Sequence, residues 1–131
     1  MEETEIYGEL PKITQVESEE FNIETYRFEE WILVNIRFKK MLEVNESKEL
    51  LELISAYIRT NCAKYGYLIL SGRMPLWFAM ALHHSILHSF KTIAIFDPKQ
   101  RGAVIVSSHT RKYRTFDIVE LPEDIITQII Q

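Results

Sequence analysis

Strand-like and helix-like segments alternate along this chain of 131 residues, and that order limits the folds open to it. Between Trp31 and Lys40 apolar and polar residues alternate with a period of two, which predicts a strand with one solvated face. Residues 46–65 instead place apolar side chains every three or four positions, which predicts an amphipathic helix that stops at Gly66. The interleaving predicts an α/β sandwich built on a mixed sheet, with a parallel core and antiparallel additions.

A second helix is predicted over residues 76–88, because Pro75 suits its first position and the segment follows a short apolar strand at residues 67–70. Residues 76–82 are apolar on every side, so we expect the front of this helix to be nearly enclosed. The remaining predicted elements are a hairpin arm at residues 21–28, strands at residues 92–96, 103–106 and 116–121, and a short C-terminal helix after Pro122.

The formal net charge of −4 hides an uneven distribution. Residues 1–30 hold ten Glu against Lys12 and Arg27, a net −8, so the rest of the chain carries +4. We expect residues 1–20 to form an extended or partly ordered acidic arm and residues 21–131 to form a single domain. The basic body of the protein suits an anionic ligand.

Composition excludes several classes of protein. Hydrophobic residues at 47% and charged residues at 26% are typical of an ordinary globular protein. Cys62, the single cysteine, can form neither an intramolecular disulfide nor a zinc cluster, which favours a reducing compartment. No apolar run approaches the length of a membrane span, and no signal peptide opens the chain. We therefore expect a cytoplasmic protein that partners neither a membrane nor duplex DNA.

Two segments follow predicted parallel strands, at the edge where open α/β sheets bind ligands. Ser71-Gly72-Arg73-Met74-Pro75 leads into the second helix, whose free N–H groups and dipole attract anions; there Arg73 suits a phosphate and Ser71 a hydroxyl hydrogen bond. An ordinary Ser-Gly turn with an exposed Arg explains the segment equally well. Asp97 ends the next strand, although Asp before Pro98 is also a common start of a turn.

All four histidines fall within residues 83–109. His84 and His88 stand four apart on the predicted helix, a spacing at which two imidazoles can share a metal. The spacing alone does not establish a metal site, since a helix that leaves the core into a solvated or interfacial surface also explains His83 and His84. The basic residues around them, opposed only by Asp97, are Lys91, Lys99, Arg101, Arg111, Lys112 and Arg114. Trp77, Phe90 and Tyr113 can stack on bases, although aromatic residues in such positions are more often part of the core.

Taken together, these segments resemble a known family. Residues 71–77, the pair His84 and His88, Asp97-Pro98, residues 102–106 and Ser108-His109 are similar in order and spacing to the Csx-three family of CRISPR-associated proteins, the third family of ring nucleases. The resemblance implies a small Rossmann-like domain that acts as a homodimer and cleaves the second messenger cyclic tetra-adenylate, with stimulation by Mn²⁺. It also implies a ligand sandwiched between two dimers, stacked into tetramers, and a role in switching off type III CRISPR antiviral signalling.

The resemblance carries site residues with it. His88 and His109 match the family's catalytic histidines, and Asp97 matches a catalytic acid that is expected either to orient an imidazole or to hold the metal. Lys99 stands where the family has an arginine, but the turn is one residue longer here, so Arg101 is an alternative source of that charge. Met74 replaces a glycine of the family loop. The implied ligand-binding residues are Ser71, Gly72, Arg73, Met74, Pro75 and Trp77.

The leading functional hypothesis is a ring nuclease in which a ribose 2′-hydroxyl attacks the adjacent phosphorus, so that no protein nucleophile is needed. One alternative is a non-catalytic sensor module that binds the same ligand and regulates a partner. Another is an interaction protein whose C-terminal helix at residues 125–130 meets a partner and which binds no nucleotide.

Overall fold

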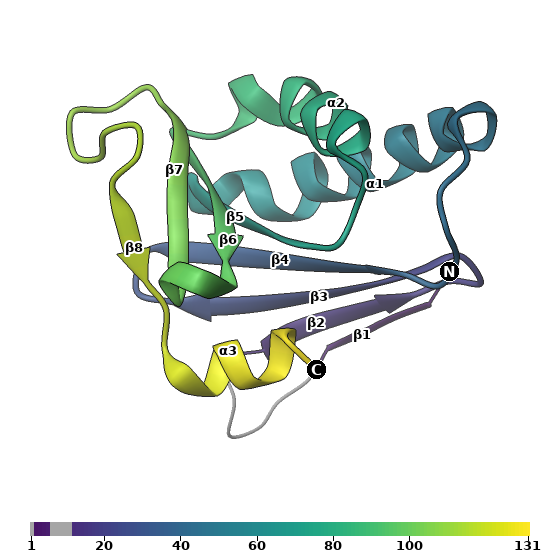
Figure 1. Ribbon diagram of the computed structural model, residues 1–131, viewed down its shortest axis with the longest axis horizontal. Coiled ribbons are helices and arrows are strands. Elements are labelled where there is room, and N and C mark those ends of the chain that lie inside the picture. Colours follow the sequence, from purple (N-terminus) through teal and green to yellow (C-terminus); the bar gives the residue numbers. More distant parts are fainter. Residues whose placement is uncertain (1, 6–11) are drawn as a thin grey trace.

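The computed structural model describes residues 2–5 and 12–131, and within them the strands form one mixed sheet of eight whose spatial order follows the chain (Figure 1). The strands are β1 (Glu2–Glu5), β2 (Lys12–Glu17), β3 (Phe21–Phe28), β4 (Trp31–Phe38), β5 (Tyr67–Gly72), β6 (Thr92–Asp97), β7 (Gly102–Ser108) and β8 (Ile118–Glu120). The helices are α1 (Ser47–Cys62), α2 (Leu76–Ile86) and α3 (Glu123–Ile129), and the 3₁₀ turns are η1 (Val44–Glu46), η2 (Ala63–Tyr65), η3 (Leu87–Ser89) and η4 (Pro98–Gln100).

The centre of the sheet is parallel and its flanks are antiparallel. Strands β4, β5 and β6 run parallel, joined by α1 and α2, whereas β1 to β4 and β6 to β8 pair with antiparallel neighbours. Helices α1 and α2 cover one face of the sheet and α3 lies against the other (Figure 1). The predicted mixed sheet with a parallel core and antiparallel additions is therefore confirmed.

The sheet has an apolar core on each face. Ile36, Ile54 and Phe78 belong to the core under α1 and α2, whereas Leu33 and Ile125 belong to the core under α3. Because both faces are covered, the first six residues of β4 are all buried, and the predicted solvated face of this strand is wrong. Even Asn35 is only 1% exposed, and its side-chain amide donates to Glu24 over 3.1 Å.

The N-terminal segment contributes strands to the same sheet. Strand β2 pairs with β3, and Val16 is fully buried in the core under α1 and α2. Strand β1 pairs with β2 at the edge. Sheet pairing thus continues into the segment that we expected as an acidic arm, of which residues 1 and 6–11 lie outside the described part of the chain.

The first two helices are shorter than predicted. Helix α1 ends at Cys62 and α2 ends at Ile86, and each continues into a 3₁₀ turn, η2 or η3, before the next strand. His88 therefore lies in η3 rather than on α2. Among the described residues, no helix combines the length and the apolar character that crossing a membrane requires.

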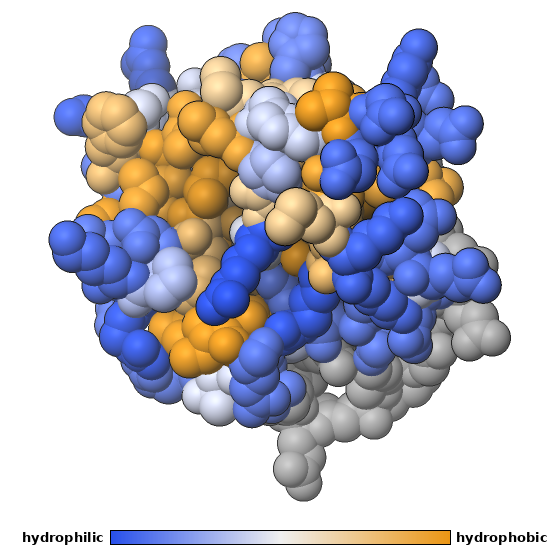
Figure 2. Space-filling model, turned by 45° about the vertical axis from the view of Figure 1, so that its right-hand side comes forward, coloured by the Kyte–Doolittle hydropathy of each residue, from blue (hydrophilic) through white to orange (hydrophobic). Residues whose placement is uncertain are grey.

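Helix α2 is not enclosed, so that prediction is also wrong. Its buried stripe is Phe78, Leu82 and Ile86, at a spacing of four residues. On the outer side Leu76 is 75% exposed and Met80 is 65% exposed, because no described element of this chain packs over them. Figure 2 shows apolar surface gathered on the left of its view and hydrophilic side chains on the right.

The connection between β7 and β8 is anchored to the turn between β3 and β4. Glu30 accepts hydrogen bonds from the Lys112 ammonium and the Tyr113 hydroxyl. The Tyr113 ring lies 4.9 Å from Trp31 and 5.6 Å from Tyr67, centroid to centroid. Residues far apart in sequence are thereby joined beside the start of β6.

We expect this anchor to make stability depend on pH. The hydrogen bonds from Lys112 and then Tyr113 hold the pKa of Glu30 below its ordinary value of 4.5. A carboxylate with a lowered folded-state pKa stabilises the fold above its unfolded-state pKa, and the contribution is lost as pH falls through the folded-state pKa. Between about pH 6 and about pH 3, wild type should therefore lose more free energy of unfolding than Glu30→Gln, since other carboxylates titrate in both proteins. Urea unfolding at each pH measures this difference, and equal losses would contradict it.

Candidate functional site

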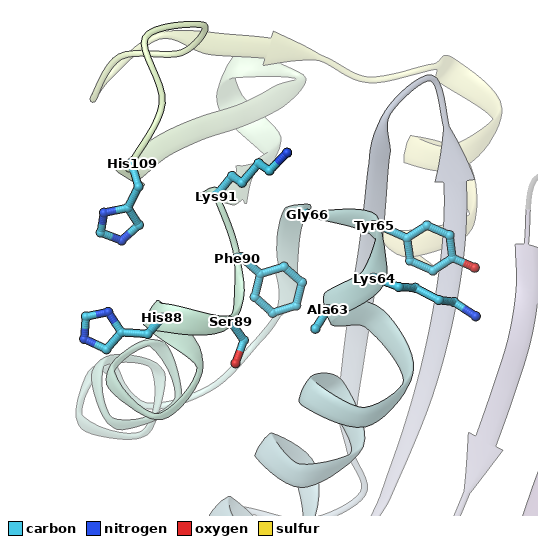
Figure 3. A pocket seen from close by; sticks show the side chains of 9 residues that line it. All are labelled: Ala63, Lys64, Tyr65, Gly66, His88, Ser89, Phe90, Lys91 and His109. Carbon is cyan, nitrogen blue, oxygen red and sulfur yellow. The ribbon is translucent and has the colours of Figure 1, made fainter.

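Two histidines lie side by side at the amino-terminal end of β6. His88 precedes this strand in η3, and His109 follows β7, whose Ser108 pairs with Thr92 at the start of β6. The two rings are nearly parallel, with 6.1 Å between centroids and 25° between planes (Figure 3). Two neighbouring imidazoles can serve one reacting group, because one ring can take a proton while the other gives one.

The two histidines form one end of a hollow of about 450 Å³. It is lined by Ala63, Lys64, Tyr65, Gly66, His88, Ser89, Phe90, Lys91 and His109. None of these lining residues is acidic, and Lys64 and Lys91 are both exposed. The hollow is therefore electropositive, as a binding site for an anion requires.

The backbone ties the two sides of this hollow together. Gly66, at a φ of 80° after η2, accepts the Lys91 amide over 2.7 Å, and the Lys91 carbonyl accepts the His109 amide over 2.7 Å. In the sequence Gly66 indicates only the end of a helix, and Lys91 is only one of several basic residues. Their pairing depends on the parallel arrangement of β5 and β6, which local sequence patterns do not reveal.

A second group of predicted site residues lies at the opposite edge of the sheet, where β5 and β6 end. Gly72 and Arg73 are exposed there, whereas Ser71 is only 6% exposed and pairs with the buried Asn35 of β4. Met74 packs against the core under α1 and α2, so its side chain serves packing. Pro75 caps α2, and Trp77 is 43% exposed.

Asp97, Lys99 and Arg101 lie near this second edge, at the end of β6. The Asp97 carboxylate accepts the Lys99 amide over 3.0 Å, as expected of a residue that starts a turn. The Arg101 guanidinium binds both oxygens of Glu123, which raises the pKa of Arg101. Lys99 is exposed and makes no ion pair within the described residues, so its ammonium, unlike the Arg101 guanidinium, is available to bind a phosphate.

One chain does not bring the two groups together. Strand β6 separates His88 from Asp97, and the steps of about 3.3 Å between its six residues place the two edges roughly 17 Å apart. We call the end of the sheet where β6 begins, with His88 and His109, the histidine edge. We call the opposite end, where β5 and β6 finish, the loop edge; it contains Ser71–Pro75, Trp77, Asp97 and Lys99.

The histidines do not form a metal centre within one chain. The described residues contain no group of three or more His, Cys, Asp or Glu side chains placed to hold a metal ion. His84 is exposed at the end of α2, whereas His88 lies in η3, outside the helix on which both were predicted. Asp97, the predicted metal ligand, lies at the other edge. The residues of one chain thus do not fit a Mn²⁺ site, and we derive no step through a metal.

The remaining histidine joins α2 to β7. His83 is half-buried, and its Nε2 lies 3.0 Å from the Ser107 hydroxyl. Burial, and then the charge of His84, lower the pKa of His83. His83 thus ties α2 to β7 and does not line the hollow.

These features define a small mixed α/β protein with an electropositive two-histidine hollow at one sheet edge and an exposed Gly-Arg loop at the other. Residues 38–120 match the family model described as CRISPR-associated protein (Cas_csx3), so the chain belongs to this CRISPR-associated family. The matched segment contains all the predicted site residues of both edges.

A relative in another organism shares part of the chain. Over 54 residues the sequence is 41% identical to an uncharacterized protein of Aquifex aeolicus (strain VF5). The alignment covers 41% of this chain and 48% of that protein, so the chain matches about half of the relative's length.

Proposed function

We propose that this protein binds cyclic tetra-adenylate and opens its ring. The observation that carries the proposal is the division of the site between two edges, with two imidazoles at one and an exposed arginine loop with an exposed lysine at the other. A flat anionic ring between two copies contacts the histidine edge of one and the loop edge of the next. The resemblance to the Csx-three family supports the same sandwiched arrangement.

The assembly that this requires is a stack of homodimers. The exposed apolar side chains on the outer side of α2, Leu76 and Met80, supply a surface that a second copy can cover. The dimers then stack so that the histidine edge of one copy faces the loop edge of the next. Each complete site is therefore shared between two copies. We further propose that the fold is related to Rossmann-like domains. The biological role proposed for the protein is that of the family, which is to end type III CRISPR antiviral signalling.

The chemistry needs no protein nucleophile. One imidazole of the pair His88 and His109 takes the proton of a ribose 2′-hydroxyl, whose oxygen then forms a bond to the adjacent phosphorus. The bond from phosphorus to the 5′-oxygen breaks, and the other imidazole protonates that leaving oxygen. The products are a 2′,3′-cyclic phosphate and a 5′-hydroxyl. Arg73 and Lys99 of the facing copy stabilise the phosphate charge.

Mixing two inactive variants tests this arrangement. His88→Ala removes one imidazole of the histidine edge, and Asp97→Ala removes the carboxylate that binds the Lys99 amide at the loop edge. Each variant alone should therefore cleave cyclic tetra-adenylate far more slowly than wild type. In an equal mixture, about a quarter of the facing pairs combine two intact edges, and about a quarter of the wild-type rate should return. A mixture no faster than its components would contradict a site shared between copies.

Product analysis decides between catalysis and binding alone. Wild type is incubated with labelled cyclic tetra-adenylate, and the products are separated with and without a metal chelator and with added Mn²⁺. Linear products support the ring nuclease, and the chelator arm measures the expected stimulation by Mn²⁺. Recovery of bound, intact ring would support the sensor module instead, and no binding at all would leave the interaction protein.

We expect Lys99 rather than Arg101 to take the place of the family arginine. Arg101 is held by Glu123, whereas the Lys99 ammonium is exposed. Lys99→Ala should weaken binding of cyclic tetra-adenylate about tenfold, the effect of losing one charged contact, and Arg101→Ala should change it less than about twofold. Titration of both variants at one salt concentration measures this, and the reverse order would assign the role to Arg101.

A further inference from the structure

The hollow at the histidine edge extends well past the two imidazoles. In Figure 3 His88 and His109 face each other at one end, Phe90 and Gly66 lie in the middle, and Lys64 and Tyr65 lie at the far end. Its volume of about 450 Å³ is within the range of sites for whole small molecules, roughly 300 to 1,000 Å³, and far exceeds one phosphate group. The two histidines therefore account for only part of the space.

Unneutralised positive charge marks the rest of the hollow. Within the described part of the chain, neither Lys64 nor Lys91 forms an ion pair with a carboxylate, although nearby Lys112 is neutralised by Glu30. A further cation stands at the far end, where the Arg27 guanidinium lies 4.0 Å from the centroid of the Tyr65 ring. Such a concentration of cations favours a second anionic group beside the first.

Lys91 is held in place by its surroundings. Its amide and carbonyl bind Gly66 and His109, each over 2.7 Å, so its backbone is fixed directly beside one of the imidazoles. Its aliphatic stem lies over Gly66, where an added Cβ would meet Lys91 Cδ at 3.7 Å, and its Nζ lies 5.9 Å from the centroid of the Tyr67 ring. Because the backbone of Lys91 is already fixed, this residue loses less freedom when it binds a ligand than a lysine on a mobile loop would lose.

Small and apolar residues lie between the charges. Phe90 is only 4% exposed, and Ala63 and Gly66 bring little or no side chain into the hollow. The middle of the hollow therefore leaves room for a ribose or a base, while the phosphates on either side meet charged groups.

From these features we propose that Lys91 and Lys64 form a second phosphate subsite, so that the histidine edge binds two consecutive phosphates of one nucleotide strand. The ligand class is an oligonucleotide with at least two phosphates, and a mononucleotide fills only half of the site. This inference rests on the proposed function, in which the first phosphate lies at His88 and His109.

Binding of linear adenylates to the full chain tests the subsite. The probes are adenosine 3′-monophosphate and the dinucleotide of adenosine that ends in a 3′-phosphate, each titrated by calorimetry over a range of salt concentrations. Wild type should bind the dinucleotide at least about tenfold more tightly, the effect of one further charged contact. The double variant Lys64→Ala/Lys91→Ala should lose this preference, and its dependence on salt should fall by about one unit of slope per lysine.

Two further variants serve as controls. Lys48→Ala removes an exposed lysine of α1 far from the hollow and should keep the full preference for the dinucleotide. Lys91→Arg, made with Lys64 intact, keeps the charge at this position and should keep most of the preference for the dinucleotide. A double variant that still prefers the dinucleotide, or a wild type without that preference, would overturn the subsite.

Failure of the subsite and failure of the proposed function give different results. If wild type cleaves cyclic tetra-adenylate and the double variant does so with unchanged KM and kcat, the function stands and the subsite is wrong. If wild type prefers the dinucleotide but never opens the ring, the subsite stands as a binding feature and the nuclease is wrong.

Discussion

His88→Ala and His109→Ala are each expected to slow ring opening by about 10² to 10⁴-fold, the usual contribution of a positioned acid or base. The reason is geometric, since the two nearly parallel rings lie 6.1 Å apart at the rim of an electropositive hollow. Single-turnover cleavage of cyclic tetra-adenylate at saturating protein isolates the chemical step from binding. Under those conditions binding of the ring should change much less than the rate.

His84→Ala is the matched control for these variants. His84 is exposed on α2 and belongs to neither edge, so its removal should leave the rate within about twofold of wild type. Wild-type rates in both His88→Ala and His109→Ala would remove the histidines from the mechanism. Because the two imidazoles act as a pair, the double variant should be little slower than the slower single variant.

Gly72→Ala is expected to destabilise the fold by about 2 to 6 kcal/mol. Gly72 has a φ of 141°, which costs an ordinary residue about 1 to 3 kcal/mol. An added Cβ would also stand 2.3 Å from the Ile36 carbonyl oxygen, a backbone atom that moves only if its strand shifts, and such overpacking costs about 1 to 3 kcal/mol more. The loop edge would shift with β5, so binding of the ring should fall in the same variant.

Gly66→Ala separates backbone strain from the clash. Gly66 also has a positive φ, of 80°, but the nearest atoms to an added Cβ are on the flexible Lys91 side chain at 3.7 Å and beyond. This variant should lose only about 1 to 2 kcal/mol, the cost of the left-handed conformation. Urea unfolding of both variants gives the comparison, and equal losses would show that the contact with Ile36 is relieved by a shift of the strand.

Local sequence patterns predicted most elements of the fold, because the spacing of apolar residues in a short segment indicates which of its sides packs against apolar neighbours. The period-two pattern at Val34, Ile36 and Phe38 placed β4, and the helical spacing of Ile125, Ile126 and Ile129 placed α3. The same patterns failed where burial came from a distant segment. Asn35 reads as solvated in sequence, yet α3 and the polar cluster with Glu24 bury it.

The outer side of α2 shows the opposite error. Leu76 and Met80 read as core because they are apolar, yet this chain alone leaves them exposed. Sequence reports that such residues avoid water, but it does not report whether the same chain or another copy covers them.

The sequence by itself determined the mixed α/β class, the family, and the residue types of the candidate site. It could not determine that His88 and Asp97, nine residues apart, lie at opposite edges of the sheet. That separation follows from the direction of β6, because a strand of six residues carries its two ends roughly 17 Å apart. Tertiary structure alone also placed Lys91 between Gly66 and His109, since hydrogen bonds between neighbouring strands join residues whose sequence separation says nothing of their distance.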